Sequence, residues 1–228
     1  MPLFFDLETT GLESTDRLCS IGFIDNDSTH YELINPAVKV GVKAMSLHHI
    51  TNEKLQEAVR FSESKVQKLL IELNRSENIL VAHNANFELE FLAKEGIYWQ
   101  GEVIDTLRCA KHLMNDLESY ALQYLRYELK LYRDEVEVAT KLKISLQEHH
   151  ALSDALWVKM LYDYLLELSD ESSLIEMTKR AVLLEKFSFG KYKDRYIEEV
   201  VMQERSYIEW LLHQEIDEDL RYSLQHYL

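Results

Sequence analysis

The chain contains 228 residues, of which 46% are hydrophobic and 29% are charged, and this balance fits a compact, helix-rich protein with one good-sized domain and a small second module. Its net charge of −15 argues against a protein that coats nucleic acid through Lys and Arg, although it leaves a nuclease open. The sequence has two widely separated cysteines, a very short apolar run before Asp6 and no membrane-length apolar stretch. We therefore expect a cytoplasmic protein without disulfides, structural zinc, signal peptide or membrane contact.

The first third of the chain predicts a meander of strands followed by a helix. Short strands are expected at residues 3–7, 18–25 and 30–34. The polar segment N-D-N-D-S between the last two strands predicts a tight turn. A loop then runs from Asn35 to Thr51, whose side chain is a candidate cap for a helix over residues 52–73.

The middle of the chain alternates between strand and helix patterns. Strands are expected at residues 79–82 and 103–104, and helices at residues 85–94, near 119–126 and at 151–168. Asp105 or Thr106 is expected to cap the helix that follows the second of these strands. Strands first, followed by alternation, predict an α/β domain built on a mixed sheet.

The last part of the chain differs in composition. Polarity rises over residues 169–173, and residues 187–196 are rich in aromatic and basic side chains. We therefore divide the chain into a first domain over residues 1–168, a linker with helical character over 169–182, and a small, mainly helical C-terminal module over 183–228. Trp210 has helical spacing from Tyr207, which predicts that it packs in the core of that module.

Asp6 and Glu8 directly follow a short apolar run. Residues i and i+2 of a strand face the same way, so both carboxylates are expected to project together. A fold tolerates such a pair near its core mainly when a divalent cation neutralises it, which makes this pair a candidate Mg²⁺ or Mn²⁺ platform. A solvated acidic turn is the alternative.

Two further segments carry groups of the same kind. Glu88 lies one turn into the helix after the strand at 79–82, and His149 precedes Asp154 by five residues at the start of the long helix. Each alone is typical of a surface acid or a capping histidine. Together with Asp6 and Glu8 they supply four carboxylates and one histidine, the set used in two-metal phosphodiester hydrolysis. Histidine suits the general base because its unperturbed pKa of about 6.5 lies near working pH.

The segments D-L-E-T-T-G, H-N-A-N-F-E and H-H-A-L-S-D-A, in this order, resemble the three motifs of the DEDDh (DnaQ-like) 3′–5′ exonucleases. Within that family they are most similar to exonuclease X and to the epsilon subunit of DNA polymerase III. The resemblance spans roughly the first 165 residues. It implies an α/β, RNase H-like fold with a five-stranded mixed sheet flanked by helices, two bound Mg²⁺ or Mn²⁺ ions, and release of nucleoside monophosphates from a 3′ end.

The resemblance assigns roles to the residues that match its motifs. Asp6, Glu8 and Asp154 match metal ligands, and His149 matches the general base because the spacing H-x-x-x-x-D selects the first of two histidines. Glu88 stands where the family has Asp. Its longer stem still ends in a carboxylate, so we expect a ligand, with lower activity or a shift toward Mn²⁺ as the consequence.

The same resemblance indicates substrate contacts. Thr10 and Leu12 match the stretch that cradles the 3′ hydroxyl and wedges against the last base. The segment L-H-H-I-T is similar to a family loop H-G-I-T, so that His48 takes a substrate-contacting position and His49 replaces a glycine. Asn84 is expected on the substrate side of the second motif, where it would hold the backbone.

Residues 189–212 look like the small C-terminal module of exonuclease X-type proteins. Within them, Lys191 and Lys193 alternate with aromatic residues, a pattern that favours phosphate contact and base stacking with a single strand. An ordinary packing turn is the alternative reading of this patch.

These observations predict a metal-dependent 3′–5′ exonuclease that acts on single-stranded or frayed 3′ ends of DNA, in repair or proofreading. The partner is then a nucleic acid 3′ end, with replication or repair proteins as further partners. The C-terminal module favours DNA over RNA. The alternatives are an RNA-trimming exoribonuclease, and a catalytically weakened nucleic-acid-binding adaptor, which only Glu88 supports.

Overall fold

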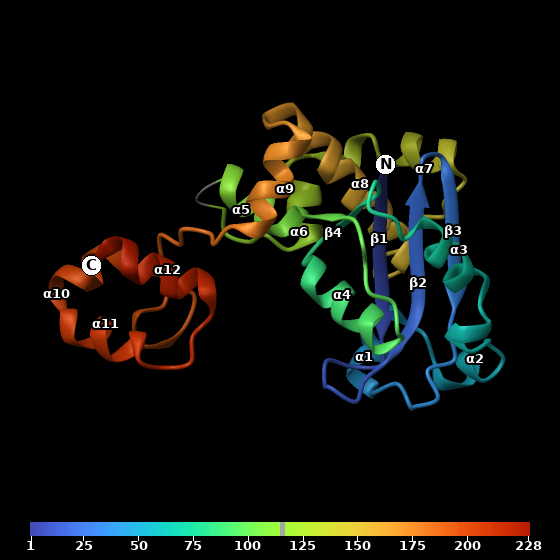
Figure 1. Cartoon of the computed structure of the whole chain (residues 1–228), viewed down its shortest axis with the longest axis horizontal. Helices are drawn as coiled ribbons and strands as arrows, with labels where there is room; N and C mark the ends of the chain where they lie inside the picture. Colours follow the sequence, from blue (N-terminus) through green and yellow to red (C-terminus); the bar gives the residue numbers. More distant parts are fainter. Residues whose placement is uncertain (115–116) are drawn as a thin grey trace. The chain divides into compact units, whose positions relative to one another are not determined.

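The computed structural model describes residues 1–114 and 117–228, which form two compact units, Met1–Thr178 and Lys179–Leu228 (Figure 1). The first unit is built on one five-stranded sheet in the order β3-β2-β1-β4-β5. The strands are β1 (Pro2–Thr9), β2 (Leu18–Asp25), β3 (Ser28–Leu33), β4 (Ile79–Ala82) and β5 (Glu102–Asp105). The first three strands are antiparallel, and β4 and β5 run parallel to β1, so the predicted mixed α/β sheet is confirmed.

Helices pack on both faces of this sheet. Those of the first unit are α1 (Val42–His48), α2 (Asn52–Gln56), α3 (Lys65–Leu73), α4 (Ala85–Lys94), α5 (Thr106–Leu113), α6 (Leu122–Glu128), α7 (Glu135–Leu142), α8 (Ala151–Leu168) and α9 (Glu171–Lys179). Short 3₁₀ turns lie at η1 (Phe61–Glu63) and η2 (Leu131–Arg133). Within the described parts of the chain, no helix combines the length and apolar character needed to cross a membrane.

The prediction of a single helix over residues 52–73 is wrong, because the structure has two separate helices there. Thr51 caps its start as predicted, but α2 ends at Gln56 and α3 begins only after Ser64, which provides a new side-chain cap. Between them, Val59 forms an isolated bridge with Ile34, and the 3₁₀ turn η1 follows. The preceding loop contains α1, a helix that the sequence did not predict.

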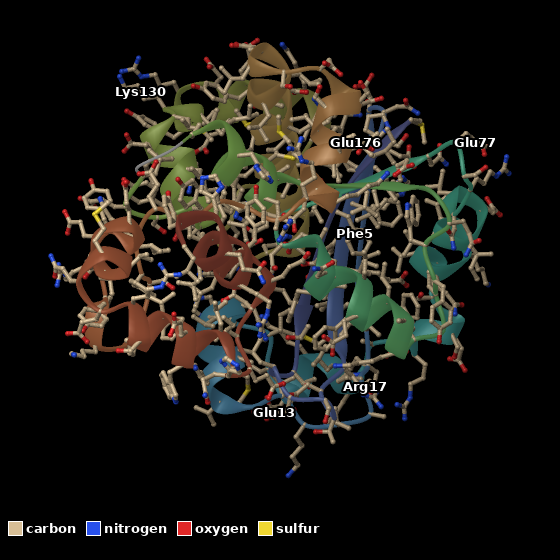
Figure 2. All side chains as sticks on the ribbon, turned by 60° about the vertical axis from the view of Figure 1, so that its left-hand side comes forward. Phe5, Glu13, Arg17, Glu77, Lys130 and Glu176 are labelled. Carbon is tan, nitrogen blue, oxygen red and sulfur yellow. The ribbon has the colours of Figure 1, made fainter. Side chains whose placement is uncertain are left out.

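Strand alternation divides the core into two layers. Leu3 and Phe5 of β1 pack with α3 and α4, whereas Phe4 packs with α5, α7 and α8. Figure 2 shows Phe5 in the packed interior, while the charged residues that it labels lie toward the surface. Gly22 of β2 lies under the start of α8, where a Cβ atom would come within 2.3 Å of the Leu152 backbone nitrogen. The missing side chain therefore lets α8 approach the sheet closely.

The second unit contains η3 (Gly190–Tyr192), α10 (Ile197–Gln203), α11 (Arg205–Leu212) and α12 (Glu218–Tyr227) around its own apolar core. The prediction that Trp210 belongs to this core is wrong, because the residue is 55% exposed, with its ring beside that of Tyr207. Helix α9, which the sequence placed within residues 169–182, packs on the first unit through the fully buried Leu174.

Candidate active site

Asp6 and Glu8 reach the site from β1. Strand alternation puts both on the face that carries Phe4. β4 pairs with β1 only from Pro2 to Phe4, whereas β1 continues to Thr9. Beyond Phe4, the edge of β1 is therefore not paired with β4. Other groups can approach Asp6 and Glu8 along this part of the edge.

Glu88 reaches this region from the first turn of α4. Its side chain is 3% exposed, and a backbone hydrogen bond from Leu7 of β1 stabilises the carboxylate. Oε2 of Glu88 has no hydrogen-bond partner among the described residues. Glu90 points elsewhere and forms an ion pair with Lys94 at 3.1 Å, which fits its expected place on the other side of α4.

Asp154 comes from the first turn of α8, which the missing side chain of Gly22 brings onto the sheet. It is 7% exposed. One ligand atom each from Glu8, His149 and Asp154 lies within 4.8 Å of the other two, a spacing that one metal ion could bridge. Together with Glu88 of α4, which lies close enough to interact with Glu8 and Asp154, three segments that are far apart in the sequence meet at the end of β1.

Burial and mutual repulsion alter the acidity of these groups. Burial, followed by the charges of Glu88, Asp154 and Glu8, raises the pKa of Asp6 well above its ordinary value. Burial and the neighbouring carboxylates raise the pKa of Glu88 in the same way. The pKa of Glu8 rises to about 8 through burial and Asp154, and burial raises the pKa of Asp154 to about 7.

The donor set fits a hard divalent cation. Carboxylate oxygens are the ligands that Mg²⁺ and Mn²⁺ prefer, and a bound cation would reverse the raised pKa values by favouring the ionised forms. The buried Oε2 of Glu88, with no hydrogen-bond partner in the described chain, is the kind of atom that such an ion would satisfy.

The two adjacent histidines are placed differently. His150 stacks on Tyr31 with ring centroids 4.2 Å apart and occupies the N-cap position of α8. His149 is exposed and has φ +53°, a left-handed conformation that costs a non-glycine residue energy. This backbone turn leaves the His149 ring beside Glu8 and Asp154.

Two of the residues expected to contact substrate have internal partners. Thr10 is 2% exposed, and its hydroxyl donates to Oδ1 of Asp16 at 2.6 Å. His48 is 4% exposed. Its Nδ1 accepts from the Ile50 backbone N–H at 3.0 Å, and its Nε2 lies 3.2 Å from the Thr9 carbonyl oxygen. Both side chains hold together the loops beside β1, and their contact with substrate stays a prediction.

The other expected substrate residues lie at the surface. Leu12 is 76% exposed in the β1–β2 loop. Asn84 is exposed at the start of α4 with φ +68°, and its backbone N–H donates to Oδ1 of Asp105. Asp105 also caps α5, so its predicted structural role is confirmed. Lys191 and Lys193 belong to the second unit, where Lys191 forms an exposed ion pair with a glutamate.

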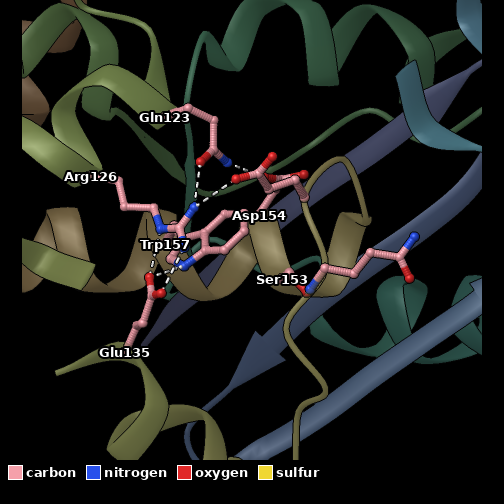
Figure 3. Close-up of polar contacts among 8 residues, drawn as sticks. Gln123, Arg126, Glu135, Ser153, Asp154 and Trp157 are labelled. Atoms are coloured by element: carbon pink, nitrogen blue, oxygen red, sulfur yellow. Dashed lines mark hydrogen bonds and ion pairs between the residues drawn. The ribbon is translucent and has the colours of Figure 1, made fainter. Parts of the chain in front are cut away.

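The sequence did not reveal the polar groups behind Asp154 (Figure 3). Nε2 of Gln123 donates to Oδ1 of Asp154 at 3.2 Å, and Oε1 of Gln123 accepts from Nη1 of Arg126 at 2.9 Å. Arg126 forms a two-pronged pair with Glu135, which also accepts from Nε1 of Trp157. No local motif marks these residues, because Gln123 and Asp154 are 31 positions apart.

Comparison with known proteins assigns the class. The chain belongs to the exonuclease family, which it matches over residues 3–162, and it is therefore a nuclease. The predicted family resemblance is confirmed. Enzymes of this family are generally metal-dependent, in keeping with the cluster of Glu8, His149 and Asp154. Residues 187–215 are similar to the C-terminal module of exodeoxyribonuclease X-like proteins.

Individual relatives refine this class. The chain is 27% identical to exodeoxyribonuclease 10 of Escherichia coli (strain K12) over 98% of its own length and 96% of that protein. It is 28% identical to the PolC-type DNA polymerase III of Caldanaerobacter subterraneus over 80% of its length, but it spans only 13% of that polymerase. A structure of exonuclease X in complex with 5′ overhanging duplex DNA shares the fold, with a TM-score of 0.59 and 21% identity. The match covers 78% of this chain and 99% of that one.

Proposed function

We propose that this nuclease is a metal-dependent 3′–5′ exonuclease that removes nucleotides from single-stranded or frayed 3′ ends of DNA. The observation that carries the proposal is the meeting of Glu8, Asp154 and His149 within 4.8 Å, beside the buried carboxylates of Asp6 and Glu88. DNA is favoured over RNA by the near full-length similarity to an exodeoxyribonuclease and by the C-terminal module.

In this proposal Asp6, Glu8, Glu88 and Asp154 hold two Mg²⁺ or Mn²⁺ ions. The ions would stabilise negative charge on the attacking and leaving oxygens. His149 takes the proton from the attacking water, whose oxygen bonds to the terminal phosphorus. The bond from that phosphorus to the preceding 3′ oxygen breaks, and the leaving oxygen takes a proton from solvent, so that a nucleoside 5′-monophosphate is released and a new 3′ hydroxyl remains. Its exposed position suits His149 to this exchange because the ring can return its proton to solvent.

Contacts outside the reacting atoms would hold the strand. Leu12 is exposed beside β1 and is proposed to press against the terminal base. Lys191 and Lys193 of the second unit are proposed to contact phosphates of the nucleic acid. DNA repair or proofreading, with replication or repair proteins as partners, is the setting proposed for this activity.

The test is an oligonucleotide assay run in parallel on DNA and RNA. A 5′-labelled strand, either single or with a recessed 3′ end, is incubated with Mg²⁺ or Mn²⁺. We expect stepwise shortening of DNA with release of monophosphates, and no reaction with EDTA or with Asp154→Asn. Faster shortening of RNA would reassign the substrate. Binding without shortening under both metals would support the adaptor instead.

A further inference from the structure

The polar groups behind Asp154 form a closed ring of contacts. Going round it, Asp154 accepts from Gln123, Gln123 accepts from Arg126, Arg126 pairs with Glu135, and Glu135 accepts from Trp157. Trp157 follows Asp154 by three positions in α8, so the helix itself closes the ring (Figure 3). These contacts join α6, α7 and α8.

The chemistry of the ring fixes the orientation of the Gln123 amide. A guanidinium can only donate, so the amide oxygen must face Arg126. The NH₂ group of the amide then faces Oδ1 of Asp154. This oxygen accepts the hydrogen bond when the carboxylate is ionised. An ordinary surface glutamine has no such constraint. Gln123 is half-buried, with one partner on each end of its amide.

Arg126 is itself tightly held. It is 8% exposed, and its Nε and Nη2 atoms each lie 2.6 Å from an oxygen of Glu135. Its guanidinium also lies 4.2 Å from the centre of the Trp157 ring, a cation–π distance. Such a planar, two-pronged pair has little freedom to rotate, which makes Arg126 a rigid support for Gln123.

Arg126 has a second link to the site. Its Nη1 atom also donates to Oε1 of Glu148 at 3.3 Å. Glu148 immediately precedes His149, whose backbone is in the left-handed conformation. One buried guanidinium is therefore connected to the proposed metal ligand through Gln123 and to the proposed general base through Glu148.

We infer that Gln123 and Arg126 are positioning residues: Gln123 sets the orientation of Asp154, and Arg126 holds Gln123 and the segment before His149. This inference rests on the proposed function, since it takes Asp154 as a metal ligand. Groups that hydrogen-bond to metal ligands typically affect metal affinity or activity by about 10–100-fold when they are changed.

The sharpest variant is Gln123→Glu. It keeps the size of the side chain and the acceptor for Arg126, but it replaces the donor to Asp154 by a second carboxylate. We expect Mn²⁺ affinity, measured by calorimetry, and kcat on a DNA oligonucleotide each to fall by about tenfold or more, with KM changed less than about twofold. Gln123→Met removes both contacts and should show a smaller loss in the same direction. Gln56→Met on the exposed face of α2 is the matched control and should behave as wild type.

A double variant tests whether Arg126 supports Gln123 without leaving an unpaired charge in the interior. Arg126→Met combined with Glu135→Gln removes the ion pair, while the new amide oxygen can still accept from Trp157. Replacing both members of a buried pair is often neutral for stability. We expect this double variant to fold and to lose Mn²⁺ affinity and kcat as Gln123→Met does. The exposed pair on α7, changed as Lys141→Met with Glu137→Gln, is its control.

Wild-type Mn²⁺ affinity and kcat in Gln123→Glu would overturn the inference, even if the double variant failed to fold. A wild-type protein that binds no Mn²⁺ and shortens no oligonucleotide would instead refute the proposed function. Because the wild type is measured in the same experiment, the two failures are distinguishable.

Discussion

Asp6 and Glu8 reach the candidate site from a strand, whereas Asp154 reaches it from the first turn of a helix. On the strand side, burial and neighbouring carboxylates raise the pKa values, to about 8 for Glu8. On the helix side, burial raises the pKa of Asp154 to about 7, and the hydrogen bond that Gln123 donates to Asp154 opposes this rise. The helix-side carboxylate is therefore oriented by a hydrogen bond from the protein itself, whereas on the strand side burial and like charges act together to raise the pKa values.

After Asp154→Asn, the largest effect is expected from His149→Ala, which tests whether the helix side also supplies the base. Losing a general base typically costs about 10²–10⁴-fold in rate, so kcat on a DNA oligonucleotide should fall in that range. Mn²⁺ affinity should change little, because oxygen donors from the four carboxylates would remain. His213→Ala, on an exposed surface of the second unit, is the control. An equal loss of Mn²⁺ affinity would mean that His149 is a metal ligand.

Metal removal should reveal the raised pKa values on both sides of the site as a pH dependence of stability. The folded-state pKa values of Glu8 and Asp154 lie above their ordinary values, so the native state binds more protons than the unfolded state between about pH 4 and about pH 8. In EDTA the melting temperature should therefore fall as pH rises through this window. Excess Mg²⁺ should restore it, and by more at pH 8 than at pH 6. Glu8→Gln should flatten the EDTA profile, and a wild-type profile that is already flat would contradict the raised values.

Helix α4 supplies the remaining carboxylate, Glu88. The substitution Glu88→Asp tests whether the site is adjusted to the longer side chain of glutamate. The shorter residue matches the family motif but retracts the carboxylate by one methylene from the buried position of Oε2. We expect kcat with Mg²⁺ to hold or to rise a few-fold, and the preference for Mn²⁺ to weaken. Glu90→Asp on the exposed side of the same helix is the control. A collapse of activity would show that the site is built around Glu88.

The sequence predicted those parts of the site that depend on local signals. Period-two alternation placed Asp6 and Glu8 on one face of β1, and a short apolar run predicted β4 at its observed bounds. The sequence also placed helices at the observed bounds of α4 and α8, although neither helix has a side-chain cap among the described residues. Both helix starts carry proposed ligands, but Glu88 and Asp154 were nominated by the combined set of acids and by the order of the three motifs, because each residue alone is typical of a surface acid.

Other features depend on contacts that no local pattern records. The Gln123–Asp154 and Arg126–Glu148 hydrogen bonds join positions 31 and 22 residues apart. The burial of His48 likewise follows from α1, whose presence in the loop was not predicted. In each case tertiary packing determines which polar group is available to substrate and which is already bonded.

The smallest effect is expected from His49→Gly, which lies outside both sides of the site. His49 ends α1 with φ +59°, at the position where the resembling family loop has glycine. The left-handed conformation costs a residue with a Cβ atom about 1–2 kcal/mol of folding free energy. Glycine avoids this cost, but its more flexible unfolded chain offsets part of the gain. Urea unfolding should therefore show a gain of up to about 1 kcal/mol, with unchanged kcat. His49→Ala, which keeps the Cβ atom, should show no gain. A loss of activity in His49→Gly would mean instead that the imidazole contacts the substrate or a metal ion.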